Sequence, residues 1–124
     1  MIDPVPKRDA PGDGERSEPL SSLGRYAGPA TLILSSLAEG DKHGYALTKD
    51  IESFAEVRLA PGTLYEALSR LERQGFIEAI KSEDRRRPYR LTASGATALA
   101  ASLTAQRRMV EVGLQRLSRG LAGA

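Results

Sequence analysis

Residues 61–92 read PGTLYEALSRLERQGFIEAIKSEDRRRPYRLT, and the hydrophobic period of this stretch changes halfway along. Its first half places three leucines at the spacing of one helical face: Leu64, Leu68 and Leu71. Pro61 suits the first turn of a helix, and Gly75 suits the position just after its end. The pattern therefore predicts a helix over residues 61–75.

The second half predicts a β-hairpin. Residues 76–81 and 87–92 are short runs rich in Ile and Tyr, which are typical of strands, and the polar residues 82–86 between them suit a loop. Pro88 has no N–H to donate to a ladder. Its strand should therefore lie at the edge of a sheet or have an incomplete ladder.

Two further helices are predicted upstream. The first begins near Pro29 and ends before Gly40, with apolar residues at helical spacing: Ala30, Ile33, Leu34, Leu37 and Ala38. The second follows Gly44, and its apolar face is formed by Leu47, Ile51 and Phe54. Three short helices followed by a hairpin and a terminal helix predict a mainly α winged helix-turn-helix.

A long Ala-rich helix is predicted after Thr92, a plausible N-cap, and extends to about Ser118. Five of its apolar residues follow an imperfect heptad repeat and form one stripe, called the seam below: Leu99, Leu103, Val110, Leu114 and Leu117. The helix could pack back on its own domain or against a second copy. We expect a homodimer, because a long apolar stripe left in water favours association.

Four segments follow from this pattern. The first is Pro-rich, has almost no apolar residues, and is expected to be disordered. The others are a winged helix-turn-helix DNA-binding domain, a C-terminal dimerisation helix and a flexible end. Their expected boundaries are 1–22, 23–92, 93–118 and 119–124.

Composition limits the class of protein. The 124 residues include no Cys and one His, so disulfides and thiolate metal sites are excluded. Residues 20–124 carry 15 basic and 11 acidic side chains, a net charge of +4, which permits a polyanionic partner. No apolar run is long enough for a membrane span or a secretory signal. We expect a soluble, cytoplasmic protein.

The helix at 61–75 and the hairpin loop carry the candidate DNA-binding residues. Helical phase puts polar side chains on the outward face of the helix, where they could contact bases or phosphates: Thr63, Tyr65, Ser69, Arg70 and Arg73. The wing, residues 82–87, adds Arg85, Arg86 and Arg87, placed for phosphates or a minor groove. Alternatively, Tyr65 packs over the wing and the arginines are ordinary solvated charges.

Nothing in the sequence indicates an enzyme. The lone His43 lies in a turn and has no second His or Cys for a metal site. No nucleophile–base set accompanies it, and no Gly-rich phosphate loop follows a strand. No cofactor or metal ion is therefore expected.

Five segments together resemble the PadR family of bacterial transcriptional regulators, in the branch with a single short C-terminal helix. They are LILSSL at 32–37, HGYAL at 43–47, PGTLYEALSRLE at 61–72, GFI at 75–77 and RRPYRLTASG at 86–95. The resemblance implies a homodimer that binds a pseudo-palindromic operator in double-stranded DNA, usually as a repressor. It also implies a small-molecule effector that releases the DNA.

Residue by residue, the resemblance assigns DNA contacts to Thr63, Tyr65 and Ser69 on the recognition helix and to the arginines at 85–87 on the wing. It adds Tyr45, at the start of the second helix, as a contact to the DNA backbone. The chain departs from the family at Ala60, which cannot cap a helix, at Pro88, and in having no Trp to stack a flat ligand. The alternative function is a winged-helix protein–protein interaction module without DNA binding.

Overall fold

The computed structural model describes residues 27–82 and 87–123. This part of the chain folds as a mainly α winged helix with one small antiparallel hairpin, which confirms the predicted fold class. The expected tail at 1–22 and the hairpin tip at 83–86 lie outside the described residues. In chain order the elements are α1 (Ala27–Leu37), α2 (Gly44–Ala55), α3 (Pro61–Arg73), β1 (Ile77–Ala79), β2 (Tyr89–Leu91) and α4 (Ala93–Gly123).

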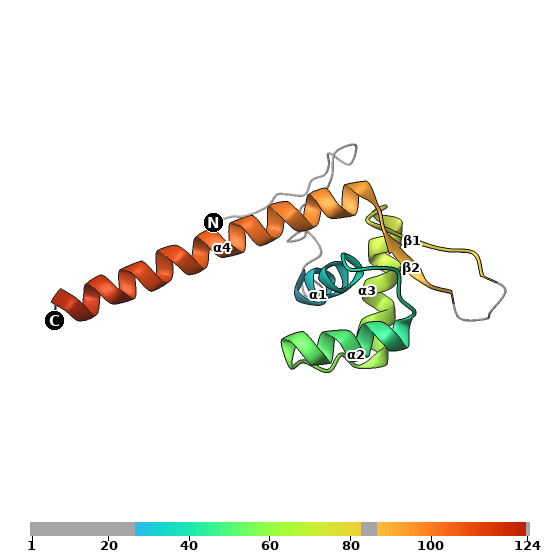
Figure 1. Ribbon diagram of the computed structural model, residues 1–124, viewed down its shortest axis with the longest axis horizontal. Helices are drawn as coiled ribbons and strands as arrows, with labels where there is room; N and C mark the ends of the chain where they lie inside the picture. The colour runs from blue at the N-terminus through green and yellow to red at the C-terminus, as the bar shows by residue number, and fades with distance from the viewer. Residues whose placement is uncertain (1–26, 83–86, 124) are drawn as a thin grey trace, which may run out of the picture.

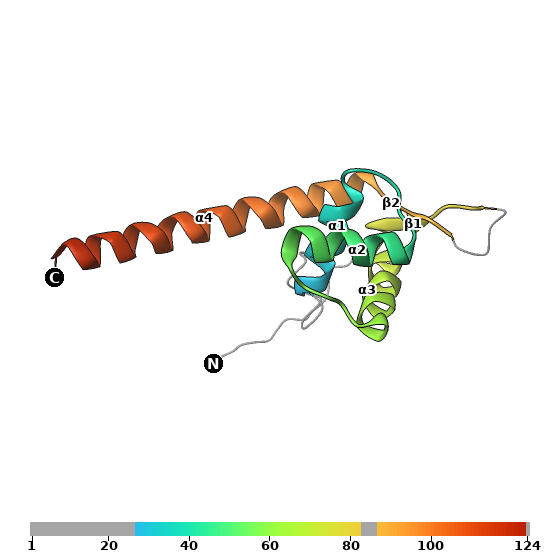
Figure 2. The same ribbon diagram turned by 60° about the horizontal axis from the view of Figure 1, so that its bottom comes forward.

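The first three helices pack together, and α4 crosses them and projects far to one side (Figure 1). The hairpin extends at the opposite end of the molecule, a relation that also holds in the turned view of Figure 2. None of the helices in the described part of the chain combines the length and hydropathy needed to span a membrane. The same residues contain no group of three or more His, Asp or Glu side chains that could hold a metal ion.

A single apolar core joins α1, α2, α3, β1 and the start of α4. The large side chains that are almost fully buried come from the predicted helical faces and from the start of the predicted first strand. They include Ile33, Leu34, Leu47, Ile51, Leu68, Leu71, Phe76 and Ile77. Ala98 and Leu99 of α4 complete the core. The winged-helix domain therefore extends past the boundary expected at residue 92. Phe54, predicted on the apolar face of the second helix, is instead 50% exposed near the end of α2.

The hairpin is shorter than the sequence predicts, with three residues in each strand. Pro88 lies just before β2 and takes part only as an acceptor, from the N–H of Ile80 at 2.8 Å. On its other side, Tyr89 exchanges two backbone hydrogen bonds with Lys42, of 2.9 and 3.2 Å. β2 therefore lies at the edge of a two-stranded sheet, as expected for the strand of Pro88, and one isolated bridge joins Tyr89 to the segment before α2.

Thr92 joins the hairpin to α4 through two hydrogen bonds. Its Oγ1 donates to the carbonyl of Gly75 at 2.6 Å and accepts from the N–H of Gly95 at 3.0 Å. The second bond satisfies a free N–H of the first turn of α4, which confirms the predicted N-cap. The first bond fixes the helix against the turn after α3, where Gly75 has a φ of 80°.

Replacing Thr92 by alanine should lower the free energy of unfolding by about 1–2 kcal/mol, because the cap and the bond to Gly75 are both lost. Urea denaturation measures this change. Thr92→Ser keeps the hydroxyl and should recover most of the loss. Equal stability of Thr92→Ala and the wild type would show that neither bond contributes.

Candidate nucleic-acid interface

The N-terminus of α3 is not capped by a side chain. Ala60 occupies the N-cap position with an extended backbone, and Pro61 opens the helix. Because alanine has no polar side chain, the first N–H groups of the helix stay open to an external acceptor such as a phosphate oxygen. This agrees with the sequence analysis, which expected Ala60 to leave the helix end uncapped.

The helical phase predicted for α3 is confirmed by burial. Leu64, Leu68 and Leu71 face the core, and the opposite face is polar. Among the candidate DNA contacts on that face, Tyr65, Ser69 and Arg73 are exposed, and Thr63 and Arg70 are half-buried. The polar face of α3 is thus accessible to a binding partner along its length.

Several polar groups on this face pair with each other. The Nε of Arg70 lies 3.4 Å from a carboxylate oxygen of Glu66, one helical turn earlier. Arg73 donates to the hydroxyl of Ser69 at 3.1 Å. Exposed ion pairs and hydrogen bonds of this kind are worth at most about 1 kcal/mol, so a phosphate could replace them at little cost.

Tyr65 reaches from α3 to the first turn of α2. Its hydroxyl lies against Gly44, and the residue as a whole is 53% exposed. Tyr89 of the wing lies close by, and burial, together with the nearby Glu72 carboxylate and Tyr65, raises the pKa of its phenol. Tyr65 therefore lies at the junction of α2, α3 and the wing, with its phenol end against α2.

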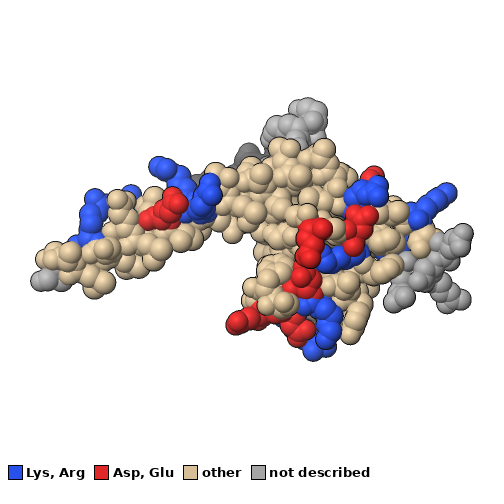
Figure 3. Space-filling model, in the orientation of Figure 1, with Lys and Arg blue, Asp and Glu red and all other residues tan. Residues whose placement is uncertain are grey.

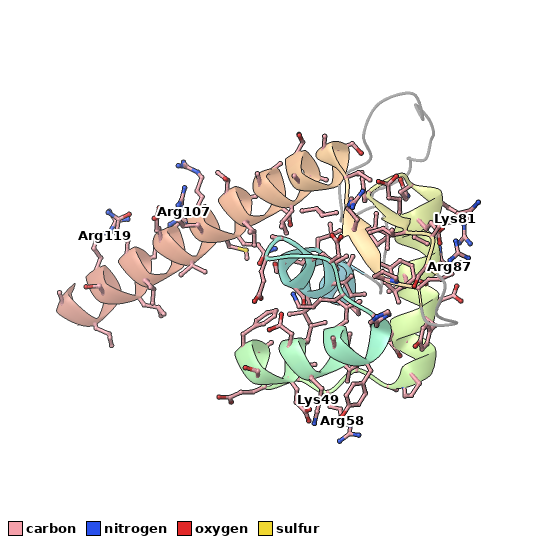
Figure 4. The ribbon with its side chains drawn as sticks, turned by 45° about the vertical axis from the view of Figure 1, so that its right-hand side comes forward. Lys49, Arg58, Lys81, Arg87, Arg107 and Arg119 are labelled. Atoms are coloured by element: carbon pink, nitrogen blue, oxygen red, sulfur yellow. The ribbon has the colours of Figure 1, made fainter. Side chains whose placement is uncertain are left out.

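The two ends of the hairpin loop are basic. Lys81 and Arg87 are exposed, and Figure 4 shows both projecting from the hairpin beside α3. Arg85 and Arg86 lie outside the described residues. Arg90, further down β2, is engaged with Asp41 at 3.5 Å and with Glu78 at 3.9 Å. Figure 3 shows basic side chains at the hairpin, beside the residues drawn in grey.

The start of α2 carries a second exposed tyrosine. Tyr45 is 69% exposed, and the ammonium of Lys49 lies 5.8 Å from the centre of its ring, within the range of a cation–π contact. In Figure 4, Lys49 and Arg58 both appear on the side of α2 that faces away from α4. Lys49 is not among the residues predicted from the sequence, although its position four residues after Tyr45 on a helix indicates that the two side chains can meet.

The apolar seam of α4 divides into two parts. Leu99 is buried in the core of its own domain, because the first turns of α4 lie on α1. Its assignment to the dimerisation surface is therefore corrected. The rest of the seam is exposed in the single chain: Leu103, Val110, Leu114 and Leu117.

α4 continues to Gly123, five residues beyond the predicted end at Ser118, so residues 119–123 of the predicted flexible end are helical. The extra turn adds Leu121, 78% exposed and four residues after Leu117, to the same stripe. An exposed apolar stripe on a projecting helix favours association with another apolar surface.

Known proteins resemble this chain in sequence and in overall fold. The sequence model described as the transcriptional regulator PadR-like family matches residues 33–101, more than half of the chain. The transcriptional regulator Rv3488 of Mycobacterium tuberculosis is 37% identical over 82 residues, which cover 64% of this chain and 72% of that protein. The crystal structure of a PadR family transcription regulator from Clostridium difficile has a TM-score of 0.65 and 31% identity. That match covers 71% of this chain and 96% of the other.

A further relative is a 37.1 kDa protein of transposon TN4556 from Streptomyces fradiae, whose name describes it as uncharacterised. It is 44% identical over 64 residues, which are 52% of this chain. The match spans only 19% of that longer protein.

Proposed function

Because the chain belongs to the PadR-like family of transcriptional regulators, we propose that it acts as a homodimer that binds a pseudo-palindromic operator in double-stranded DNA. The observation that carries the proposal is the exposed polar face of α3, beside a basic wing and with an uncapped N-terminus. A helix presented in this way suits a major groove. The proposal includes no reaction, cofactor or metal ion, and it places the protein in the cytoplasm.

In the proposed complex, α3 enters the major groove. Tyr65, Thr63 and Ser69 contact bases or the backbone, and Arg70 and Arg73 neutralise phosphates. Tyr45 contacts the backbone from the start of α2, where Lys49 adds a positive charge. The wing, residues 82–87, contacts phosphates or the adjacent minor groove through its arginines.

Two copies of α4 form the proposed dimer through Leu103, Val110, Leu114 and Leu117. A two-fold dimer presents two copies of α3 to two half-sites, which is why the operator is expected to be pseudo-palindromic. A repressor acts by occupying such a site. A small molecule that binds near the α4 interface would release the DNA by changing the separation of the two recognition helices.

The contribution of the wing to DNA affinity can be measured from the salt dependence of binding. Replacing Lys81 and Arg87 together by alanine should reduce the slope of log K against log salt by about 1.8, since each lost phosphate contact on B-DNA contributes about 0.9. The slope is measured by titrating a labelled operator duplex at several salt concentrations.

The matched control removes two positive charges from α4. Arg107 and Arg119 project from α4, far from the hairpin (Figure 4). The variant with both replaced by alanine should keep the wild-type slope. A slope that falls equally in both double variants, or in neither, would show that the wing does not contact phosphates.

A further inference from the structure

The first residue of α2 is Gly44, and the conformation of α2 does not require a glycine at this position. It is buried, and its backbone does not adopt the left-handed conformation that favours glycine. In an ordinary helical conformation alanine is the better helix former. The reason for a glycine here should therefore lie in a neighbouring element.

That neighbour is Tyr65 of α3. A Cβ built on Gly44 would lie 2.5 Å from the hydroxyl oxygen of Tyr65, 3.1 Å from its Cζ and 3.4 Å from its Cε1, and these are the three nearest atoms. Real Cβ contacts below 3.0 Å are essentially absent from proteins. The phenol end of Tyr65 thus occupies the space that any larger residue at position 44 would take.

The contact fixes the end of a side chain that is otherwise half exposed. Tyr65 keeps 53% of its surface exposed to solvent. An exposed tyrosine on a helix would sample more than one rotamer, and ordering it on binding costs free energy. Because Gly44 has no side chain, the hydroxyl of Tyr65 can occupy this space in the free protein, before a partner binds.

We propose that Gly44 is a positioning residue for DNA binding, which holds the phenol of Tyr65 in its binding orientation across the α2–α3 junction. The inference rests on the proposed function, in which Tyr65 contacts DNA. Because the overlapping atom is the far end of a side chain and not backbone, Gly44→Ala should displace Tyr65 and leave the fold intact. The variant would then lose affinity without losing stability.

The test is a double-mutant cycle on operator affinity, with Gly44→Ala, Tyr65→Phe and the two combined. Gly44→Ala should weaken specific binding about tenfold, at an unchanged melting temperature. Tyr65→Phe removes the oxygen at 2.5 Å and leaves the nearest ring atom at 3.1 Å. In that background, Gly44→Ala should therefore cost less than about twofold.

The matched control is Gly28→Ala in α1, where an added Cβ would have no neighbour within 4 Å. It should bind as the wild type does. In the free protein, the ring resonances of Tyr65 should shift in Gly44→Ala and stay in place in Gly28→Ala.

Two results would overturn the inference and leave the proposed function standing. One is wild-type affinity in Gly44→Ala while Tyr65→Ala weakens binding. The other is the same loss from Gly44→Ala in both backgrounds, which would mean that position 44 acts independently of the hydroxyl. A wild-type protein that binds no duplex specifically would overturn the proposed function, and the inference with it.

Discussion

Replacing Gly95 by alanine is expected to lower the free energy of unfolding by about 3 kcal/mol, and the melting temperature by roughly 15 °C. A Cβ at this position would lie 2.0 Å from the carbonyl oxygen of Phe76 and 2.9 Å from its carbonyl carbon. These atoms are backbone, at the start of the wing, and cannot rotate away. The first turn of α4 would have to move off the hairpin, taking Leu99 out of the core.

Gly120→Ala in the same helix is the matched control. An added Cβ there has no neighbour within 4 Å, so the variant should be as stable as the wild type or slightly more stable. Thermal unfolding followed by circular dichroism at equal protein concentration compares the two. A melting temperature for Gly95→Ala within about 2 °C of the control would contradict the close packing of α4 on the wing.

Replacing Val110 and Leu114 together by glutamate should convert the protein to a monomer and weaken operator binding about 100-fold. Both side chains are exposed in the single chain, at 54% and 62%, so the substitutions leave the winged-helix core intact. In the proposed dimer they would place carboxylates in an apolar interface, where burial of unpaired charge is costly. A monomer loses the avidity that joins the two half-sites.

The control adds the same charge to the opposite side of α4. Ala105 and Gln115 are exposed and lie 120° or more around the helix from Val110. Their double glutamate variant should keep the mass and affinity of the wild type, as measured by light scattering and DNA titration. A wild-type mass for the Val110 and Leu114 variant would contradict dimerisation through this stripe.

Local sequence patterns were sufficient to predict most of the fold. The leucine spacing of residues 61–75 set the phase of α3, so the outward position of Tyr65 and Ser69 followed from the sequence. Thr92 was identifiable as an N-cap because capping depends on a few adjacent residues. The roles of these side chains in DNA binding stay predictions.

Contacts between segments far apart in the chain could not be predicted from local sequence patterns. Leu99 and Leu103 occupy one helical stripe, and periodicity alone does not tell which of them meets its own domain and which a second copy. The pairing of Lys42 with Tyr89 joins residues far apart in the chain, as does the contact of Tyr65 with Gly44. These relations depend on how the helices and the wing pack, which only the three-dimensional structure defines.

The most direct test of the account is fluorescence anisotropy of the full chain on labelled duplexes from the region upstream of its own gene, against shuffled duplexes, at about 0.15 M salt. A regulator that reads sequence through α3 should bind one of these duplexes at least ~10³-fold more tightly than the shuffled sequence. Equal, weak binding to every duplex would contradict the account, and would favour a winged helix that serves as a protein–protein interaction module.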